Sequence, residues 1–375
     1  MTVQTTRLGL VADRDTHSAA LLERLIRIGL VRLAGQYADG EFVFTVTGEP
    51  EPGGGWQLRP AGTSLRYAAI VALGLLRVSG AEQQTVLAGQ TCDELIGLLA
   101  KRLDGMTGVG DTALVCWAAA EAGHSELPHA LARLAELDRK PRPLDMVSAA
   151  WVVSALVAAR HRADVEEHLA AARKRLLAAR GESAYPHTTG PAAPWYRAHV
   201  GSFADQVYPI QALARLHASS ADPEALAAAN EVARVICDAQ GPAGQWWWHY
   251  DSRTGGVVEG YPVYTVHQHA MAPMALLDLA DADGEPHLDN ICRGLRWLAA
   301  PPEADVQLVL DDPPITWRKV ARGDQRKLVR GLRAATTRLH PGTRIQALDR
   351  VYPPGVVDHE CRPYELGWLL MTWLS

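Results

Sequence analysis

The sequence predicts an all-α fold, an (α/α)6 toroid of six helical hairpins with small β or loop insertions, and three observations lead to this prediction. Ala, Leu, Arg and Glu dominate the long segments while Val, Ile and Phe are sparse, which is the composition of helices. Amphipathic stretches alternate with stretches that are apolar on nearly every face. The alternation recurs roughly every 35 to 60 residues, as in a helical array. We therefore expect residues 1–375 to form a single toroid domain.

The six amphipathic stretches are the expected outer helices. Apolar residues recur with the 3.6-residue period, and the charged face of each stretch indicates contact with water. In 165–180 the acidic residues come first and the basic residues last, which matches the helix dipole. The predicted outer helices cover about residues 15–35, 84–103, 127–138, 163–180, 222–239 and 285–299.

The six Ala-rich stretches are the expected inner helices, because a helix that is apolar all round must be buried. They cover residues 64–77, 111–123, 145–159, 203–216, 266–280 and 363–374. Two segments interrupt the alternation. Residues 40–60 alternate like a short β-hairpin, and residues 301–362 form a long insertion before the last inner helix. Insertions of this length are often functional.

Composition excludes several classes of partner. A net charge of -5 and a pI near 6.3 give no reason to expect nucleic acid or an anionic membrane. Five scattered Cys without a CxxC pair predict neither a disulfide framework nor a zinc ribbon. No apolar run approaches the roughly 20 residues of a membrane span, and the N-terminus does not resemble a signal peptide. We expect a cytoplasmic protein of undetermined oligomeric state.

Polar residues stand at the start of every predicted inner helix. Since the inner helices of a toroid run in one direction, these side chains would ring one mouth of the cavity, beside the positive ends of the helix dipoles. Asp111 and Asp145 suit ordinary N-caps equally well. Capping does not explain Arg66, whose charge opposes the dipole. The groups are Arg66, Tyr67, Asp111, Asp145, Asp205, Gln206, Tyr208, His267, Gln268, His269, Arg362, Tyr364 and Glu365.

The stretch from 244 to 279 gathers aromatic and titratable residues before the fifth inner helix. Neighbours on a strand alternate faces, so Trp246, Trp247 and Trp248 cannot all be core residues. The loop is either an aromatic plug or a platform on which a sugar ring stacks. His267 and His269 project on different sides of their helix, so one is expected to face the cavity. The same stretch supplies His249, Tyr250, Glu259 and Tyr264.

Basic residues of the long insertion form one helical stripe of Arg326, Lys327, Arg330 and Arg333. Such a stripe is either a solvated face or a cap that recognises a carboxylate or phosphate. Residues 356–368 contain metal-ligand types without a recognised spacing, so we expect neither a metal nor another cofactor. Phosphate-binding loops, HExxH and GxSxG are missing, which leaves nucleotide-driven chemistry and serine hydrolysis without support.

Three short motifs resemble known toroid enzymes. QGPAGQW (240–246) has the Q-x3-G-x-W spacing of squalene cyclases and prenyltransferase-like toroids, and GDTALVCWAAAEAG (110–123) resembles one of their inner helices. WWWHYD followed by YPVYTVHQHAMAPMALLDLADADG resembles sugar-active toroids such as the N-acylglucosamine epimerases and the unsaturated glucuronyl hydrolases. A terpenoid cyclase or prenyltransferase-like enzyme, acting on a prenyl substrate through carbocation chemistry, is the weaker alternative. The DxDD motif of the cyclases is incomplete and Phe is rare, and neither the zinc site nor the partner subunit of a prenyltransferase is evident. A non-catalytic toroid that binds glycans or proteins is a further alternative.

The preferred hypothesis is an enzyme that performs acid/base chemistry on a carbohydrate-like or other anionic polar small molecule. Epimerisation, isomerisation or elimination is favoured over hydrolysis, which usually needs two facing carboxyls. His267 or His269 would be the base, with His249 or a phenol as the acid. The other expected catalytic residues are Tyr250, Tyr264, Tyr364 and Asp111, and the expected substrate-binding residues are Arg66, Tyr67, Asp205, Gln206, Trp246, Trp247, Trp248, Glu259, Gln268, Arg362 and Glu365.

Overall fold

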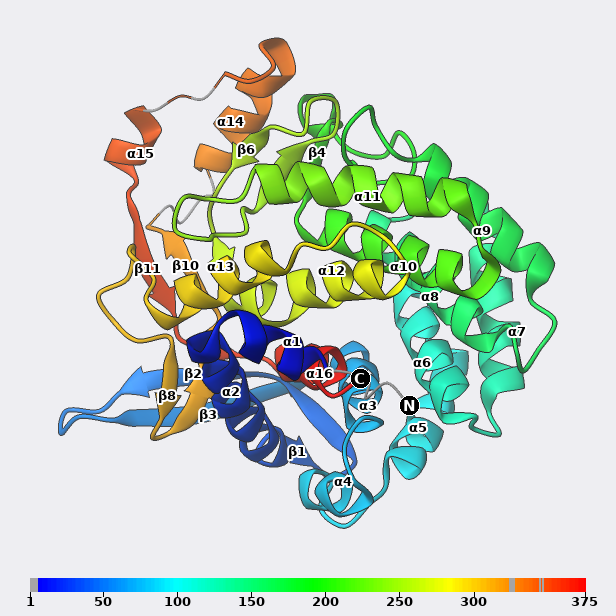
Figure 1. Ribbon diagram of the computed structural model, residues 1–375. Coiled ribbons are helices and arrows are strands. Elements are labelled where there is room, and N and C mark those ends of the chain that lie inside the picture. The colour runs from blue at the N-terminus through cyan, green and yellow to red at the C-terminus, as the bar shows by residue number, and fades with distance from the viewer. Residues whose placement is uncertain (1–5, 324–327, 344, 346) are drawn as a thin grey trace.

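The computed structural model describes residues 6–323, 328–343, 345 and 347–375. In these residues the protein is mostly helical, with sixteen α-helices and twelve mostly short strands (Figure 1). None of the described helices is both long and apolar enough to cross a membrane. The predicted all-α class with small β insertions is confirmed.

Six helices form an inner ring, each where the sequence predicts one. They are α3 (Leu65–Leu75), α6 (Val109–Ala122), α8 (Met146–Ala159), α10 (Ala204–Ser220), α12 (Ala272–Asp281) and α16 (Pro363–Trp373). The ring closes because α3 contacts α6 and α16, α8 contacts α6 and α10, and α12 contacts α10 and α16. Most of their residues are buried, since small Ala side chains let helices pack on more than one side. A π-helical turn, η3 (His267–Met271), leads into α12.

Outer helices pack one apolar face on this ring. They are α2 (Thr16–Ala34), α5 (Cys92–Ala100), α7 (Leu127–Asp138), α9 (Glu166–Ala178), α11 (Pro223–Asp238) and α13 (Leu288–Ala299). The short helix α1 (Arg7–Arg14) precedes α2, and Asp15 ends α1 and caps α2. The predicted alternation of outer and inner helices is therefore confirmed.

One predicted outer helix is divided. Residues 84–103 were expected to form a single helix, but α4 (Gly80–Val86) and α5 are separate elements. Ala88 and Gly89 have φ angles of 52° and 94°, which an α-helix does not accommodate. Thr91 then begins α5 with a capping box that includes Glu94.

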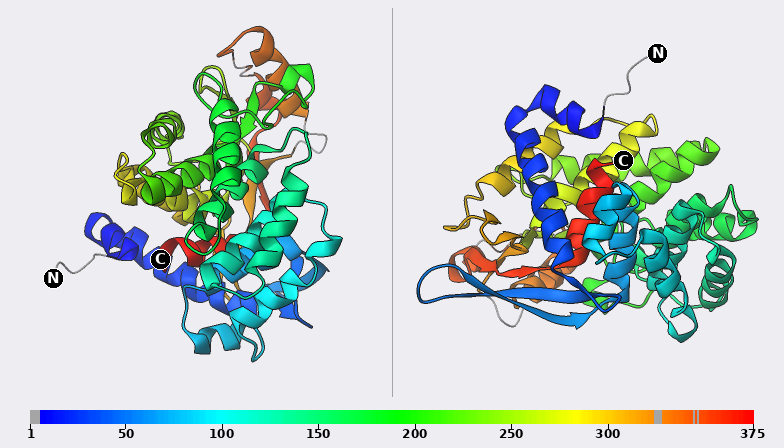
Figure 2. Two further views of the ribbon diagram at one scale, coloured as in Figure 1. Left: turned by 90° about the vertical axis from the view of Figure 1, so that its right-hand side faces the viewer. Right: turned by 90° about the horizontal axis from the view of Figure 1, so that it is seen from below.

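The predicted hairpin is β2 (Glu41–Pro50) with β3 (Trp56–Thr63), and it extends to the edge of the molecule (Figure 2). Strand β1 (Tyr37–Ala38) pairs with β2, and so does β12 (Glu360–Cys361) just before α16. A second sheet joins β4 (Val200–Ser202), β5 (His249–Asp251) and β6 (Val257–Glu259). Because β3, β4 and β12 lead directly into inner helices, these sheets lie at the N-terminal ends of the ring.

The long insertion brings its own strands to the same end. Strand β10 (Lys319–Arg322) lies between β7 (Val263–Tyr264), which precedes η3, and β11 (Pro354–Asp358). The hairpin of β8 (Val309–Asp311) and β9 (Pro314–Thr316) comes before it, and helices α14 (Leu328–Leu339) and α15 (Ala347–Val351) come after it. Helix α14 contacts β6 and the 3-10 turn η2 (Trp195–Arg197). The insertion therefore covers the N-terminal end of the ring on one side.

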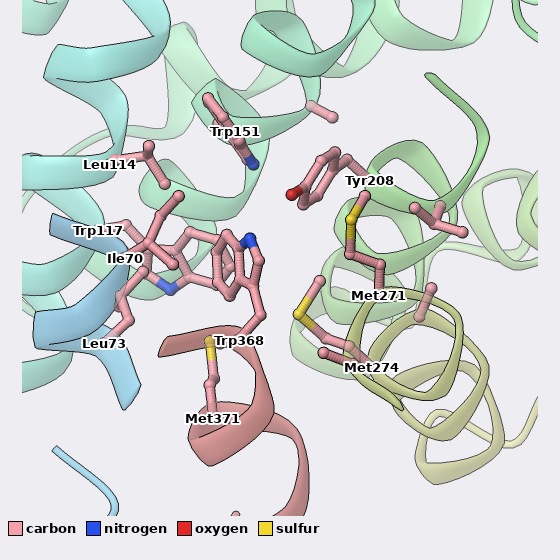
Figure 3. Close-up of a cluster of buried hydrophobic side chains, with 14 of the residues drawn as sticks. Ile70, Leu73, Leu114, Trp117, Trp151, Tyr208, Met271, Met274, Trp368 and Met371 are labelled. Atoms are coloured by element: carbon pink, nitrogen blue, oxygen red, sulfur yellow. The ribbon is translucent and has the colours of Figure 1, made fainter. Parts of the chain in front are cut away.

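Large apolar side chains fill the middle of the ring. Trp117 and Trp368 lie there with ring centroids 5.9 Å apart, among Leu73, Met274 and Met371 (Figure 3). At the C-terminal ends of the inner helices a cavity of about 250 Å³ is lined by residues that include Arg7, Arg77 and Arg215. Asp278 and Asp281, which form ion pairs with Arg7, line it as well.

Candidate functional site

A cavity of about 190 Å³, here called the mouth cavity, lies at the N-terminal ends of five inner helices. Four of these helices contribute pairs of residues one turn apart, which is the spacing that puts side chains on one face. Tyr67 and Tyr364 add phenols from α3 and α16, while Trp248, Tyr264 and Arg318 come from the surrounding loops and strands. The pairs are Arg66 and Ile70, Val147 and Trp151, Ala204 and Tyr208, and His267 and Met271.

Aromatic rings form much of the wall of the mouth cavity. The imidazole of His267 is stacked on Trp248 and lies 5.0 Å from the ring of Tyr264, measured between centroids. Tyr67 and Tyr364 are 4.7 Å apart on the α3 and α16 side. Flat apolar faces next to phenol and imidazole groups provide the combination that packs on a sugar ring and binds its hydroxyls.

His267 is the first residue of the π-helical turn η3 and lines the mouth cavity. Single π turns in α-helices are frequent at functional sites. Burial lowers the pKa of His267 to about 3, and the positive charge of Arg318 adds to this effect. His267 is therefore a neutral imidazole at neutral pH.

Arg318 is the positive group at the centre of the site. Its guanidinium carbon lies 4.9 Å from the centroid of the Tyr264 ring, and its Nε lies 3.3 Å from Glu365 Oε1. Burial raises the pKa of Glu365 to about 7, although Arg318 opposes this shift. The Arg318–Glu365 pair thus changes its net charge near neutral pH.

Two further arginines stand at the edge of the mouth cavity. Arg66 forms an ion pair with Asp111 and lies over the ring of Trp151, at 5.6 Å from its centroid. Arg362 donates from Nη1 to the hydroxyl of Tyr67 at 3.1 Å and from Nε to a carboxylate oxygen of Glu360 at 3.0 Å. Asp145 does cap α8, whereas Asp111 lies inside the first turn of α6 and does not act as an N-cap.

A second cavity of about 420 Å³, here called the basic cavity, adjoins the first. It is shaped by β7, β10 and α14, and Trp248, Tyr264 and Arg318 line both cavities. Lys319, Arg322 and Arg330 also line it, together with Glu259. Of the predicted basic stripe, Arg330 lies in this wall, Arg333 is buried behind it, and Arg326 and Lys327 lie outside the described residues.

Ten of the expected site residues line these cavities or contact the lining. Arg66, Tyr67, Trp248, Tyr264, His267 and Tyr364 line the mouth cavity, and Glu259 lines the basic cavity. Asp111, Arg362 and Glu365 each contact a lining residue. These residues come from segments far apart in the sequence, so the fold gathers them at one end of the ring.

The other expected residues lie behind this lining. Within the triplet Trp246–Trp248 only Trp248 lines the cavities, since Trp246 packs on Phe203 and Trp247 on Tyr261. Tyr250 is fully buried on the far side of Phe203, and His249 is buried beside Trp248.

The remaining four expected site residues, which are His269, Gln268, Gln206 and Asp205, also lie outside the lining of the cavities. His269 is buried and lines neither cavity, and its backbone carbonyl accepts a hydrogen bond from Trp373 Nε1. Gln268 and Gln206 bind backbone carbonyls, and Asp205 accepts hydrogen bonds from Ser202. We therefore assign supporting places to these side chains, as to Trp246, Trp247, His249 and Tyr250.

Several lining residues were missed from the sequence. Trp151 lies one turn inside an apolar helix, and its position follows from the spacing of four residues after Val147. Tyr208, in contrast, was among the residues expected at the mouth, and it lines the cavity. Arg318 offers no such signal, because its place depends on the pairing of β10 with β7. No group of three or more His, Cys, Asp or Glu side chains in the described residues is arranged to hold a metal ion.

A histidine near the mouth was also missed. His187 Nδ1 lies 3.0 Å from Asp205 Oδ2, and this hydrogen bond raises the pKa of His187. The carbonyl of His187 accepts from the backbone N–H of Met146 at the start of α8. The exposed imidazole therefore stands between the starts of α8 and α10, beside the predicted Asp205.

Comparison with known proteins establishes the fold. No protein-family model and no curated protein matches the sequence. Among solved structures, an unsaturated glucuronyl hydrolase specific for heparin is 12% identical with a TM-score of 0.56, over 94% of this chain and 95% of that chain. The enzyme from Streptococcus agalactiae is 10% identical with a TM-score of 0.56, over 96% and 90%. The enzyme from Bacillus sp. GL1 is 13% identical with a TM-score of 0.51, over 86% and 96%.

At these identities the likeness shows the fold alone. The chain has the α/α toroid of these enzymes, and the predicted resemblance to sugar-active toroids is confirmed at this level.

Proposed function

We propose that this protein is an enzyme that binds a carboxylate-bearing sugar in the mouth cavity and transfers protons to and from it. The observation that carries the proposal is the meeting of His267, Tyr264 and Arg318 around one aromatic cavity. The structurally similar enzymes are named glucuronyl hydrolases, which supports a uronate as the sugar class.

Each group has a chemical task in this proposal. Arg318 binds the substrate carboxylate and lowers the pKa of the adjacent C–H bond. His267 removes that proton, and the negative charge of the bound carboxylate raises the pKa of the imidazole toward the useful range. Tyr264 or Tyr364 then delivers a proton.

Two outcomes are consistent with these groups. In epimerisation, a proton leaves the carbon beside the carboxylate and another arrives on the opposite face. In elimination, the neighbouring C–O bond breaks instead, and the departing oxygen takes the proton from the phenol. Hydrolysis by two carboxyls is less well supported, because no carboxylate lines the mouth cavity among the described residues.

A prenyl substrate is also less well supported. The large apolar side chains of the ring pack against one another along the axis, and the space that is left is bordered by charged and phenolic groups.

The test is incubation of the protein with uronate oligosaccharides in D2O. Epimerisation places deuterium at the carbon beside the carboxylate, elimination creates a product that absorbs in the ultraviolet, and hydrolysis creates new reducing ends. Deuterium incorporation or an unsaturated product is the expected result. New reducing ends alone would assign hydrolysis in place of proton transfer, and binding without turnover would indicate a non-catalytic toroid.

A further inference from the structure

The basic cavity has a charge distribution that the proposed reaction does not need. Arg318, Lys319, Arg322 and Arg330 line it, and Glu259 is the one carboxylate among its described lining residues. A cavity bordered mainly by one sign of charge concentrates ligands of the opposite sign.

Glu259 is held by two arginines and a backbone N–H, and one of these arginines, Arg322, also lines the cavity. Its carboxylate accepts from Arg333 Nη1 at 2.9 Å, from Arg322 Nη2 at 3.2 Å and from the backbone N–H of Tyr261 at 2.8 Å. Both Glu259 and Arg333 are buried. Asp349 contacts Arg322, and Asp358 contacts Lys319, but neither lines the cavity. Arg322 and Lys319 are thus ion-paired, and the described lining of the cavity consists of four basic side chains, one carboxylate and uncharged groups.

The buried His249, next to the cavity, is affected by nearby positive charges. The pKa of His249 lies well below its usual value because of burial, and then because of the charges of Arg197 and Arg330. His249 lies beside Trp248, with ring centroids 5.4 Å apart. Burial and these two positive charges together keep His249 uncharged.

The basic cavity is in direct contact with the mouth cavity. Trp248 and Tyr264, whose ring centroids are 4.9 Å apart, border both spaces. Arg318 and Lys319 lie over the Tyr264 ring, at 4.9 Å and 5.5 Å from its centroid. A ligand that fills one space thus lies one side chain away from the other.

The sizes of the two spaces agree with a shared ligand. Ligand sites usually measure about 300 to 1,000 Å³. The mouth cavity, at about 190 Å³, is below this range, and the basic cavity, at about 420 Å³, is within it. One molecule that spans both spaces uses the full site.

We propose that the basic cavity is an anion subsite and that the substrate is an acidic saccharide of at least two units. The reacting sugar occupies the mouth cavity, and a carboxylate or sulfate on the adjoining unit binds Lys319, Arg322 and Arg330. This inference rests on the proposed function, since it takes the mouth cavity as the reaction site.

Binding measurements by calorimetry test the subsite without requiring turnover. The ligands are a uronic acid monosaccharide and disaccharides in which the unit beside the uronate is neutral, carboxylated or sulfated. The acidic disaccharides are expected to bind at least about tenfold more tightly than the neutral one, as a charge-assisted contact provides. Comparison of the carboxylated with the sulfated disaccharide shows which anion the subsite prefers.

The variant Lys319→Gln is expected to remove most of this preference while affinity for the monosaccharide changes little. Lys174→Gln, on the exposed face of α9, is the matched control and is expected to change neither affinity. Equal affinity for acidic and neutral disaccharides would overturn the subsite even if turnover is found. Preference for the acidic disaccharides without turnover would overturn the proposed reaction alone, and binding of none of these ligands would overturn both.

Discussion

The imidazole of His267 lies parallel to the indole of Trp248, with 5.9 Å between the ring centroids and 8° between the planes. Phe203 packs on the same imidazole at 4.4 Å. This aromatic surrounding removes His267 from water and keeps it uncharged. The same indole also borders both cavities, so the proposed base and the proposed stacking platform are one packed unit.

Replacing the proposed base should abolish proton transfer without unfolding the protein. We expect His267→Gln to lower kcat about 100-fold or more, the usual contribution of a general base. Deuterium incorporation in D2O measures this effect. His269→Gln is the matched control, since His269 is equally buried but lines neither cavity, and it should keep most of the activity. Equal losses in both variants would contradict the assignment.

Removing the indole should weaken binding more than it slows the reaction. Trp248→Ala is expected to weaken affinity for a uronate about three- to tenfold, as lost ring stacking implies, whereas Trp248→Phe should restore much of it. Trp195→Ala, at an exposed tryptophan outside both cavities, provides the control. An unchanged dissociation constant for Trp248→Ala in calorimetry would exclude the stacking role.

Anion affinity should depend on pH through Glu365. Below about pH 7 this buried carboxyl is protonated, so Arg318 and Arg362 keep more of their charge for a ligand, and uronate binding should strengthen as the pH falls. Above it the carboxylate neutralises Arg318, and affinity should decline. Glu365→Gln imitates the protonated form and should bind tightly at both pH values. Calorimetric titrations between about pH 6 and 8 measure the affinity of the wild type and of Glu365→Gln. If the affinity of the variant depends on pH as strongly as that of the wild type, another group is responsible for the dependence.

The ion pair behind the basic cavity should matter for stability. Arg333→Met leaves the carboxylate of Glu259 buried with one of its two arginines, and removal of one partner from a buried pair costs about 3 to 5 kcal/mol. Urea denaturation measures the loss. Arg338→Met, one turn and a residue further along α14 and exposed, should change stability little. A loss of less than about 1 kcal/mol in Arg333→Met would show that the pair contributes little.

The sequence predicts the ring well and the site only in part, for physical reasons. Burial on all faces identifies the inner helices, and their common direction is enough to place Arg66, Tyr67, His267 and Tyr364 together at one end of the ring. The break at Ala88 was not foreseen, because a left-handed alanine carries no signature in composition.

Pairing between strands that are distant in the sequence is a second reason why the site could not be predicted fully. Arg318 enters the site because Lys319 is in register with Tyr264, and such a register is decided by tertiary contacts. The Trp triplet is limited in the same way. Alternation predicts that its side chains do not all lie on one face, but the packing of Trp246 on Phe203, which the sequence does not reveal, determines which of them is buried.

The filled axis makes the mouth cavity a blind pocket. Below Tyr208 and Met271 the tryptophans and methionines of the ring close the path, and no described residue lines both this cavity and the one at the opposite end. A polysaccharide therefore has no route to thread through the ring. Under the proposed function, the substrate would enter and the product would leave through the same opening.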